Sequence, residues 1–246
     1  QTCALPIFDL SGFKHDSKEA VWSYFEERVS QFGPGEWILC KGFDQVLVNG
    51  LASPHISYLD SIAPNNPIFI GSLSMHNYWA NSMAFDAAGI DKHSVDPSES
   101  SYYEKDEGGN LTGYIVEQEA FKPFKESMIK ALGNDLLKEN CVTVLDQYAS
   151  NGNTTITAMG ITTDDPNIIR LYEHLSSEES TFINRLLSKI GLLPERKPTV
   201  RHFVFVRSDA SQIIPASVDN GDDFFKMVGI KFWYDGSPYS GTMYID

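Results

Sequence analysis

The 246-residue chain has few cysteines and few basic residues. Its three cysteines, Cys3, Cys40 and Cys141, are widely spaced and form no C-x-x-C pair, which excludes a disulfide framework and leaves Cys40 and Cys141 as expected small buried hydrophobes. Lysine and arginine number 19 against 33 acidic residues, giving a net charge of -14. Such a surface repels phosphate groups, so we expect neither a nucleic-acid nor a membrane partner.

Several sequence signals are also missing. No run of 18 apolar residues occurs, so no transmembrane helix is predicted. No G-x-G-x-x-G follows a predicted strand and no G-K-[ST] loop occurs, which disfavours nucleotide-binding folds. No signal peptide opens the chain; a cytoplasmic location is favoured, but the true N-terminus is expected to be missing and the compartment stays open.

Both ends of the sequence indicate a fragment. Residues 1–7, Q-T-C-A-L-P-I, look like the translation of a common sequencing-library adapter, so we set them apart from the fold. The other end stops without a terminal tail at Asp246. We therefore expect residues 8–246 to be an internal part of a longer protein, forming one domain with a polar surface excursion near residues 91–111.

Predicted strands alternate with predicted helices along the chain. Helices are expected at residues 16–32, 57–62, 81–88, 121–132, 136–150, 167–174 and 177–190, and strands at 37–40, 67–74, 112–116, 152–159, 200–206 and 224–233. This order predicts an α/β fold with a parallel sheet. Without a nucleotide-binding motif, a partial (β/α)8 barrel is favoured, missing its first and last strands.

In such a barrel the site lies at the carboxyl ends of the strands. The polar residues expected there are Asp44, His76, Thr157, and Lys231 with Asp235. Lys231 is the most informative, because Ile230, Phe232 and Trp233 flank it. Burial would favour a neutral amine, which can react with carbon dioxide to form a metal-bridging carbamate. Alternatively, Lys231 is an ordinary strand lysine that reaches solvent.

Five groups of motifs occur in the order in which the amidohydrolase superfamily, family 3 (YtcJ-like and formamide-deformylase-like), carries them, and the chain resembles that family over nearly all of residues 8–246. The motifs are G-E-W-I at 35–38 with G-F-D at 42–44; L-D at 59–60 with P-N-N-P at 64–67; His76 with N-S at 81–82 and A-A-G-I at 87–90; Gly109 with T-G at 112–113 and Glu117; and G-I-K at 229–231 with D-G-S at 235–237 and Thr242.

The resemblance implies a metal-dependent barrel enzyme that hydrolyses C–N bonds of small amide-like substrates other than peptides. It implies one or two divalent ions, with zinc expected, and Lys231 as a carbamylated lysine bridging them. Asp235 would orient that lysine or bind substrate, or else only form the Asp-Gly turn. A homo-oligomer is left open.

The resemblance also implies a substrate-binding group. His76 would face the pocket rather than bind metal, the alternative being a structural histidine. Asn81 would cap a helix first and contact substrate second. Trp233 indicates an apolar or aromatic substrate group, and Glu117 is expected to be structural.

One departure from the family pattern decides what this chain alone can do. The family's first metal ligands form an H-x-H pair, and no H-x-H occurs here. Its later histidines and aspartate would follow the end of the sequence. A divalent ion needs several protein ligands, so we expect the 246 residues alone to be inactive. The alternative function is a non-catalytic binding or regulatory relative that kept the barrel and lost the ligands.

Overall fold

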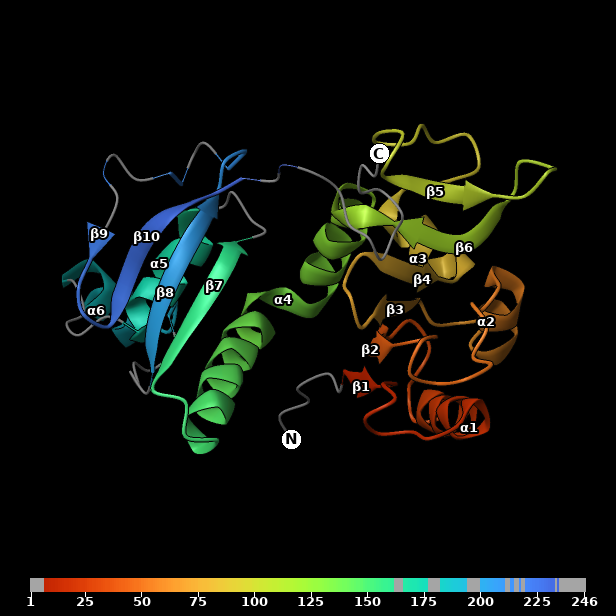
Figure 1. Cartoon of the computed structure of the whole chain (residues 1–246), viewed down its shortest axis with the longest axis horizontal. Helices are drawn as coiled ribbons and strands as arrows, with labels where there is room; N and C mark the ends of the chain where they lie inside the picture. Colours follow the sequence, from red (N-terminus) through yellow and green to blue (C-terminus); the bar gives the residue numbers. More distant parts are fainter. Residues whose placement is uncertain are drawn as a thin grey trace. The chain divides into compact units, whose positions relative to one another are not determined.

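The computed structural model describes residues 7–161, 166–176, 182–193, 200–210, 213–214, 217, 220–232 and 234. The chain divides into two compact units (Figure 1). Of the described residues, 7–133 belong to unit 1, and those from 134 to 234 belong to unit 2. Each unit contains its own β-sheet, and each is described by itself.

Unit 1 is built on a six-stranded sheet in the order β1-β2-β3-β4-β6-β5. Its strands are β1 (Phe8–Asp9), β2 (Ile38–Phe43), β3 (Ile68–Ser72), β4 (Asn77–Ala80), β5 (Tyr102–Lys105) and β6 (Leu111–Val116). Strands β1, β2 and β3 pair in parallel, whereas β3–β4, β4–β6 and β5–β6 are antiparallel.

The expectation of a parallel sheet is therefore wrong for half of unit 1. The sequence prediction extended the strand that corresponds to β3 to residue 74 and did not include β4. In the structure the chain turns back over residues 73–76, and β4 follows directly. A connection this short can join only antiparallel strands. The polar segment 91–111, expected as a surface excursion, contains β5 and the turn into β6, which pair as an antiparallel hairpin.

Three helices of unit 1 precede the long helix that follows β6. They are α1 (Lys18–Val29), α2 (Ile56–Ile62) and α3 (Ser82–Ala88). The N-cap of α1 is Ser17, whose side chain accepts from Ala20 N, so the helix begins two residues after the start expected at residue 16. At α3, Asn81 is the N-cap as expected, and Gly89 ends the helix in the left-handed conformation that glycine adopts without steric cost.

Helix α4 (Glu117–Ser150) contains a break at Gly133, where φ is 77° and ψ is 162°. This is a backbone conformation that residues with a side chain rarely adopt. The break agrees with the two separate helices expected at 121–132 and 136–150, and it coincides with the boundary between the units.

Unit 2 holds a four-stranded sheet in the order β7-β8-β10-β9. The strands are β7 (Thr155–Ile161), β8 (Arg201–Arg207), β9 (Asn220–Gly221) and β10 (Phe225–Lys231). As predicted, β7, β8 and β10 are parallel; among the described strands of this sheet, the short β9 alone is antiparallel. Helices α5 (Pro166–Ser176) and α6 (Phe182–Lys189) separate β7 from β8 along the chain.

Each unit buries its own apolar residues. In unit 1 one cluster lies around Phe25, Ile38 and Trp79 and another around Tyr78, Phe85 and Phe124. In unit 2 the clusters lie around Val204 and Phe225 and around Leu145 and Leu175. Cys40 is buried as expected, and Cys141 is partly buried.

The molecule is thus an α/β protein, as the sequence predicts. Neither sheet closes on itself among the described residues, so the partial (β/α)8 barrel stays a prediction. Within the same residues, no helix has the length and apolar character needed to cross a membrane.

Candidate functional site

The predicted site residues are distributed over both units. His76 and Asn81 belong to unit 1 and Lys231 to unit 2. Trp233 and Asp235 lie outside the described residues. Of the other strand-end residues expected, Asp44 does follow β2 directly, whereas Thr157 lies inside β7 and not at its end.

Lys231 is the last residue of β10, at the carboxyl end of the parallel strands. It pairs in register with Arg207, the last residue of β8, and its carbonyl oxygen accepts from Ser208 N at 3.0 Å. The Arg207 Nε donates to Asp209 Oδ1 at 2.8 Å. The carboxyl edge of this sheet therefore presents two cationic side chains and one carboxylate.

The expected apolar burial of Lys231 is wrong in its extent. The lysine is half-buried, and the neighbouring Phe232 is 70% exposed. Residue 232 follows the last paired residue of β10, so the sheet does not cover it. The expected position of Lys231 at a strand end is present in the structure.

Asn81 is fully buried, and backbone groups use all of its hydrogen-bonding capacity. Its Oδ1 accepts from Ile68 N at 2.8 Å and from Ala84 N at 3.1 Å. Its Nδ2 donates to Asn66 O at 2.8 Å and to Ala63 O at 3.4 Å. The side chain ties β3 to the start of α3 and leaves no polar atom for a substrate, which argues against the substrate contact expected from the sequence.

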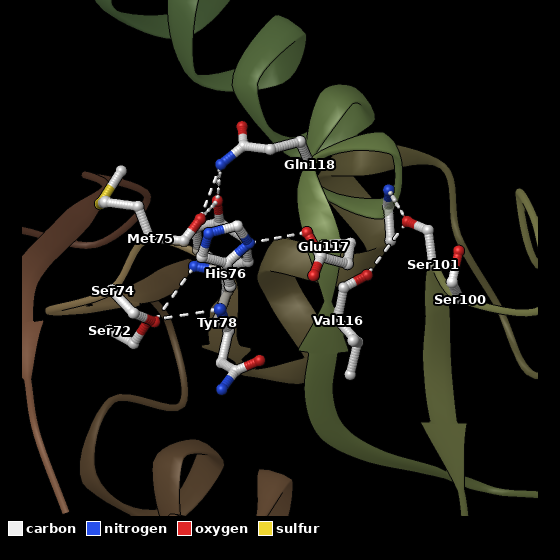
Figure 2. Close-up of polar contacts among 12 residues, drawn as sticks. Ser72, Ser74, Met75, His76, Tyr78, Ser100, Ser101, Val116, Glu117 and Gln118 are labelled. Carbon is white, nitrogen blue, oxygen red and sulfur yellow. Dashed lines mark hydrogen bonds and ion pairs between the residues drawn. The ribbon is translucent and has the colours of Figure 1, made fainter. Parts of the chain in front are cut away.

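His76 lies in the short connection between β3 and β4, not at the end of a strand as predicted. Its Nδ1 is 2.8 Å from Glu117 Oε2, and Figure 2 shows the two side chains pointing toward each other. The side chains are 31% and 18% exposed, respectively. Glu117 thus has a specific polar partner in this region, a role that its sequence neighbourhood did not indicate.

Backbone contacts hold the two residues of this pair. Glu117 N donates to His76 O at 2.7 Å, and β4 and β6 are in register at Asn77 and Val116. Next to His76, Met75 has φ 61°, and Glu117 itself has φ 67°. Left-handed backbone at residues other than glycine is uncommon and concentrates at functional sites, which makes this region a candidate site.

Gln118 joins the same region from the first turn of α4. Its Nε2 donates to Met75 O at 2.6 Å and to the Tyr78 hydroxyl at 2.5 Å (Figure 2). The Tyr78 hydroxyl in turn donates to Met75 O. Burial and then the Glu117 charge raise the pKa of Tyr78, so its hydroxyl stays protonated at neutral pH. No sequence signal pointed to Gln118, because its partners, Met75 and Tyr78, are distant in sequence.

The described residues do not by themselves form a metal centre. No group of three or more histidine, cysteine, aspartate or glutamate side chains among them could hold an ion. Lys231 would supply one bridging ligand as a carbamate, and His76 and Glu117 are only a pair. A divalent ion would need ligands from outside the described part of the chain.

The family model described as "Amidohydrolase family" matches residues 3–246. Similar curated proteins include the exoenzymes regulatory protein AepA of Pectobacterium carotovorum subsp. carotovorum, 33% identical over 51% of this chain and 27% of that protein. The N-substituted formamide deformylase of Arthrobacter pascens is 32% identical over 42% of this chain and 19% of that protein. The putative amidohydrolase YtcJ of Bacillus subtilis (strain 168) is 27% identical over 42% of this chain and 19% of that protein.

Among solved structures, an uncharacterized metal-dependent hydrolase from Pyrococcus horikoshii OT3 has a similar fold, with a TM-score of 0.51 and 18% identity. The alignment covers 95% of this chain and 40% of that one, and the matches to the curated relatives span at most 27% of their lengths. The family model covers almost every residue, including all five groups of motifs, and the chain therefore belongs to the amidohydrolase family.

Proposed function

We propose that this chain is part of a metal-dependent hydrolase that cleaves C–N bonds other than peptide bonds in small amide-like molecules. Family membership supports hydrolysis, and the relative named for deformylating N-substituted formamides supports the amide class. The observation that carries the proposal is the position of Lys231 at the carboxyl end of a parallel strand, where α/β enzymes place their catalytic groups.

In this proposal Lys231 reacts as its neutral amine with carbon dioxide, losing a proton and becoming an anionic carbamate. The carbamate would be an anionic ligand for one divalent ion or would be shared by two, with zinc as the expected metal. Asp235 would act as an orienting or catalytic carboxylate, and Trp233 would be an apolar substrate contact. His76 would bind substrate.

This chain would supply only some of the ligands of the metal. When bound, a divalent ion activates water and polarises a carbonyl oxygen. Overall, the carbonyl carbon gains a hydroxyl group from water, the C–N bond breaks, and the nitrogen gains a proton. One lysine cannot bind the ion alone, and the sequence has no H-x-H pair, so we propose that the 246 residues by themselves are inactive.

The test uses a longer natural protein that contains this sequence. Metal content and hydrolysis of formamides and secondary amides are measured for the wild type and for Lys231→Ala. Lys226→Ala is the matched control, because it removes the same charge from the opposite half of β10. Loss of metal and of hydrolysis only in Lys231→Ala supports the proposal. Unchanged metal content and rate in that variant would overturn the role of Lys231.

A second candidate function is regulation without catalysis. It is favoured by one specific observation, the 33% identity to a protein named as a regulator of exoenzymes. This candidate predicts that the sequence upstream of residue 8 contains no H-x-H pair and that the longer protein purifies without a divalent ion. Finding both the pair and the metal would exclude it.

A further inference from the structure

The contact with Glu117 determines which ring nitrogen of His76 carries the proton. Its Nδ1 is 2.8 Å from Glu117 Oε2. A carboxylate can only accept a hydrogen bond, so the imidazole must carry its proton on Nδ1. In the neutral ring, Nε2 then holds a lone pair and acts as a hydrogen-bond acceptor. The partner of one ring nitrogen thus decides what the other can bind.

Nothing in the described part of the chain uses Nε2. No hydrogen bond joins it to a described residue, and it is not one of the buried side-chain atoms without a partner. With the His76 side chain 31% exposed, this nitrogen is open to an incoming molecule. A ligand placed there would meet an acceptor.

The backbone fixes this arrangement from both sides. His76 O accepts from Glu117 N at 2.7 Å, and Gln118 Nε2 donates to Met75 O at 2.6 Å, so the residues on either side of the pair are tied together. Met75 and Glu117 both keep left-handed backbone that their side chains disfavour. Such cost is retained where a side chain must be held in one orientation.

We propose that Glu117 is a positioning residue that fixes the tautomer of His76, and that His76 Nε2 accepts a hydrogen bond from the N–H of the substrate. The substrate class would then be amides and formamides that carry an N–H, in preference to N,N-disubstituted ones. The substrate part of this inference rests on the proposed function, whereas the tautomer part does not.

The expected preference for substrates with an N–H follows from the hydrogen bond to His76 Nε2 that an N-methylated substrate cannot make. A site that offers an acceptor to an N–H loses that bond when the nitrogen carries a methyl group instead. Loss of one such bond corresponds to a preference of about tenfold or more. The added methyl group also has a steric effect, so the change in preference between variants is the informative quantity.

The first experiment measures the tautomer directly in the 246-residue chain. Nitrogen-15 shifts of the His76 ring are recorded at a pH where titration shows the ring to be neutral. Glu117→Gln is compared with Glu119→Gln, which removes an exposed charge two residues further along α4. We expect the proton on Nδ1 in the wild type and in Glu119→Gln, and a mixture in Glu117→Gln, whose amide can also donate. A proton on Nε2 in the wild type would overturn the inference.

The second experiment measures kcat/KM in the longer, metal-loaded protein for a secondary amide and its N-methylated counterpart. We expect a preference of about tenfold or more for the secondary amide in the wild type and in Glu119→Gln, reduced severalfold in Glu117→Gln. Equal kcat/KM for both amides in the wild type would overturn the substrate inference alone. Failure to hydrolyse either amide would instead overturn the proposed function.

Discussion

Two histidines, one in each unit, are held in different ways. In unit 1, His76 has a carboxylate partner and Asn81 has four backbone partners. In unit 2, His202 on β8 is 5% exposed, and its Nδ1 has no hydrogen-bond partner among the described residues. The rings of Tyr172 and Phe225 pack against it, with centroids at 5.0 and 6.0 Å.

This difference separates two reasons for finding histidine inside a protein. A histidine with a partner on one nitrogen is oriented and can use the other nitrogen for binding. A histidine among apolar rings contributes volume and is kept neutral, and burial accordingly lowers the pKa of His202 to about 4. The comparison favours His76 over His202 as a histidine that binds a ligand.

The largest expected effect comes from removing a fully satisfied polar group. Asn81→Ala leaves the buried Ile68 N–H without its partner and removes the cap of α3, so we expect a loss of about 3 kcal/mol of unfolding free energy. Urea unfolding followed by tryptophan fluorescence measures this, since Trp22, Trp37 and Trp79 all lie in unit 1.

Asn77→Ala is the matched control for that variant, because the buried Asn77 Oδ1 has no hydrogen-bond partner among the described residues. We expect it to change stability by less than about 1 kcal/mol. Equal losses in the two variants would show that hydrogen bonding of Asn81 does not stabilise unit 1.

The second effect is the dependence of unit 2 on pH. His202 has a folded pKa of about 4, below its ordinary value of 6.5, so its contribution to stability is complete above pH 6.5 and is lost as the pH falls toward 4. The full loss amounts to about 3 kcal/mol at most. Amide hydrogen exchange of β8 between pH 7 and 4 measures it.

His202→Leu should remove this part of the pH dependence, whereas His93→Gln, at an exposed position, should leave it unchanged. A pH dependence that is the same in His202→Leu and in the wild type would assign the acid sensitivity of unit 2 to its carboxylates.

The smallest effect concerns backbone strain beside His76. Met75 has φ 61° and is 49% exposed, so Met75→Gly relieves the left-handed conformation with little loss of burial. We expect a gain of up to about 1 kcal/mol in unfolding free energy. Met75→Ala keeps the strain and should show no gain; urea unfolding of both variants distinguishes them.

Much of the fold follows from local sequence patterns. Periodicity and caps placed α1, α3 and the strands β7, β8 and β10 to within a few residues, because each depends on neighbours along the chain. The prediction failed at β4, where apolar residues 78–80 follow β3 so closely that one strand and a tight hairpin look alike. Hence the antiparallel pairing of β4 with β3 and with β6 was missed.

The candidate site was harder to predict than the fold. The motif pattern pointed to His76, but not to its contact with Glu117, which lies 41 residues away in sequence. That contact depends on the pairing of β4 with β6, which periodicity does not reveal. The interaction of Gln118 with Met75 depends on the same pairing. Side-chain partners across a sheet become visible only once its register is known.

The break at Gly133 has a consequence for tolerance to mutation. Its backbone angles, φ 77° and ψ 162°, are available to glycine at little cost and to other residues only with strain. An alanine there, which elsewhere in a helix is the most favourable residue, would drive the two segments of α4 toward one continuous rod. A saturation scan along α4 would therefore show alanine to be harmful at Gly133 because of the backbone conformation, and not because of lost packing as at the buried Phe124.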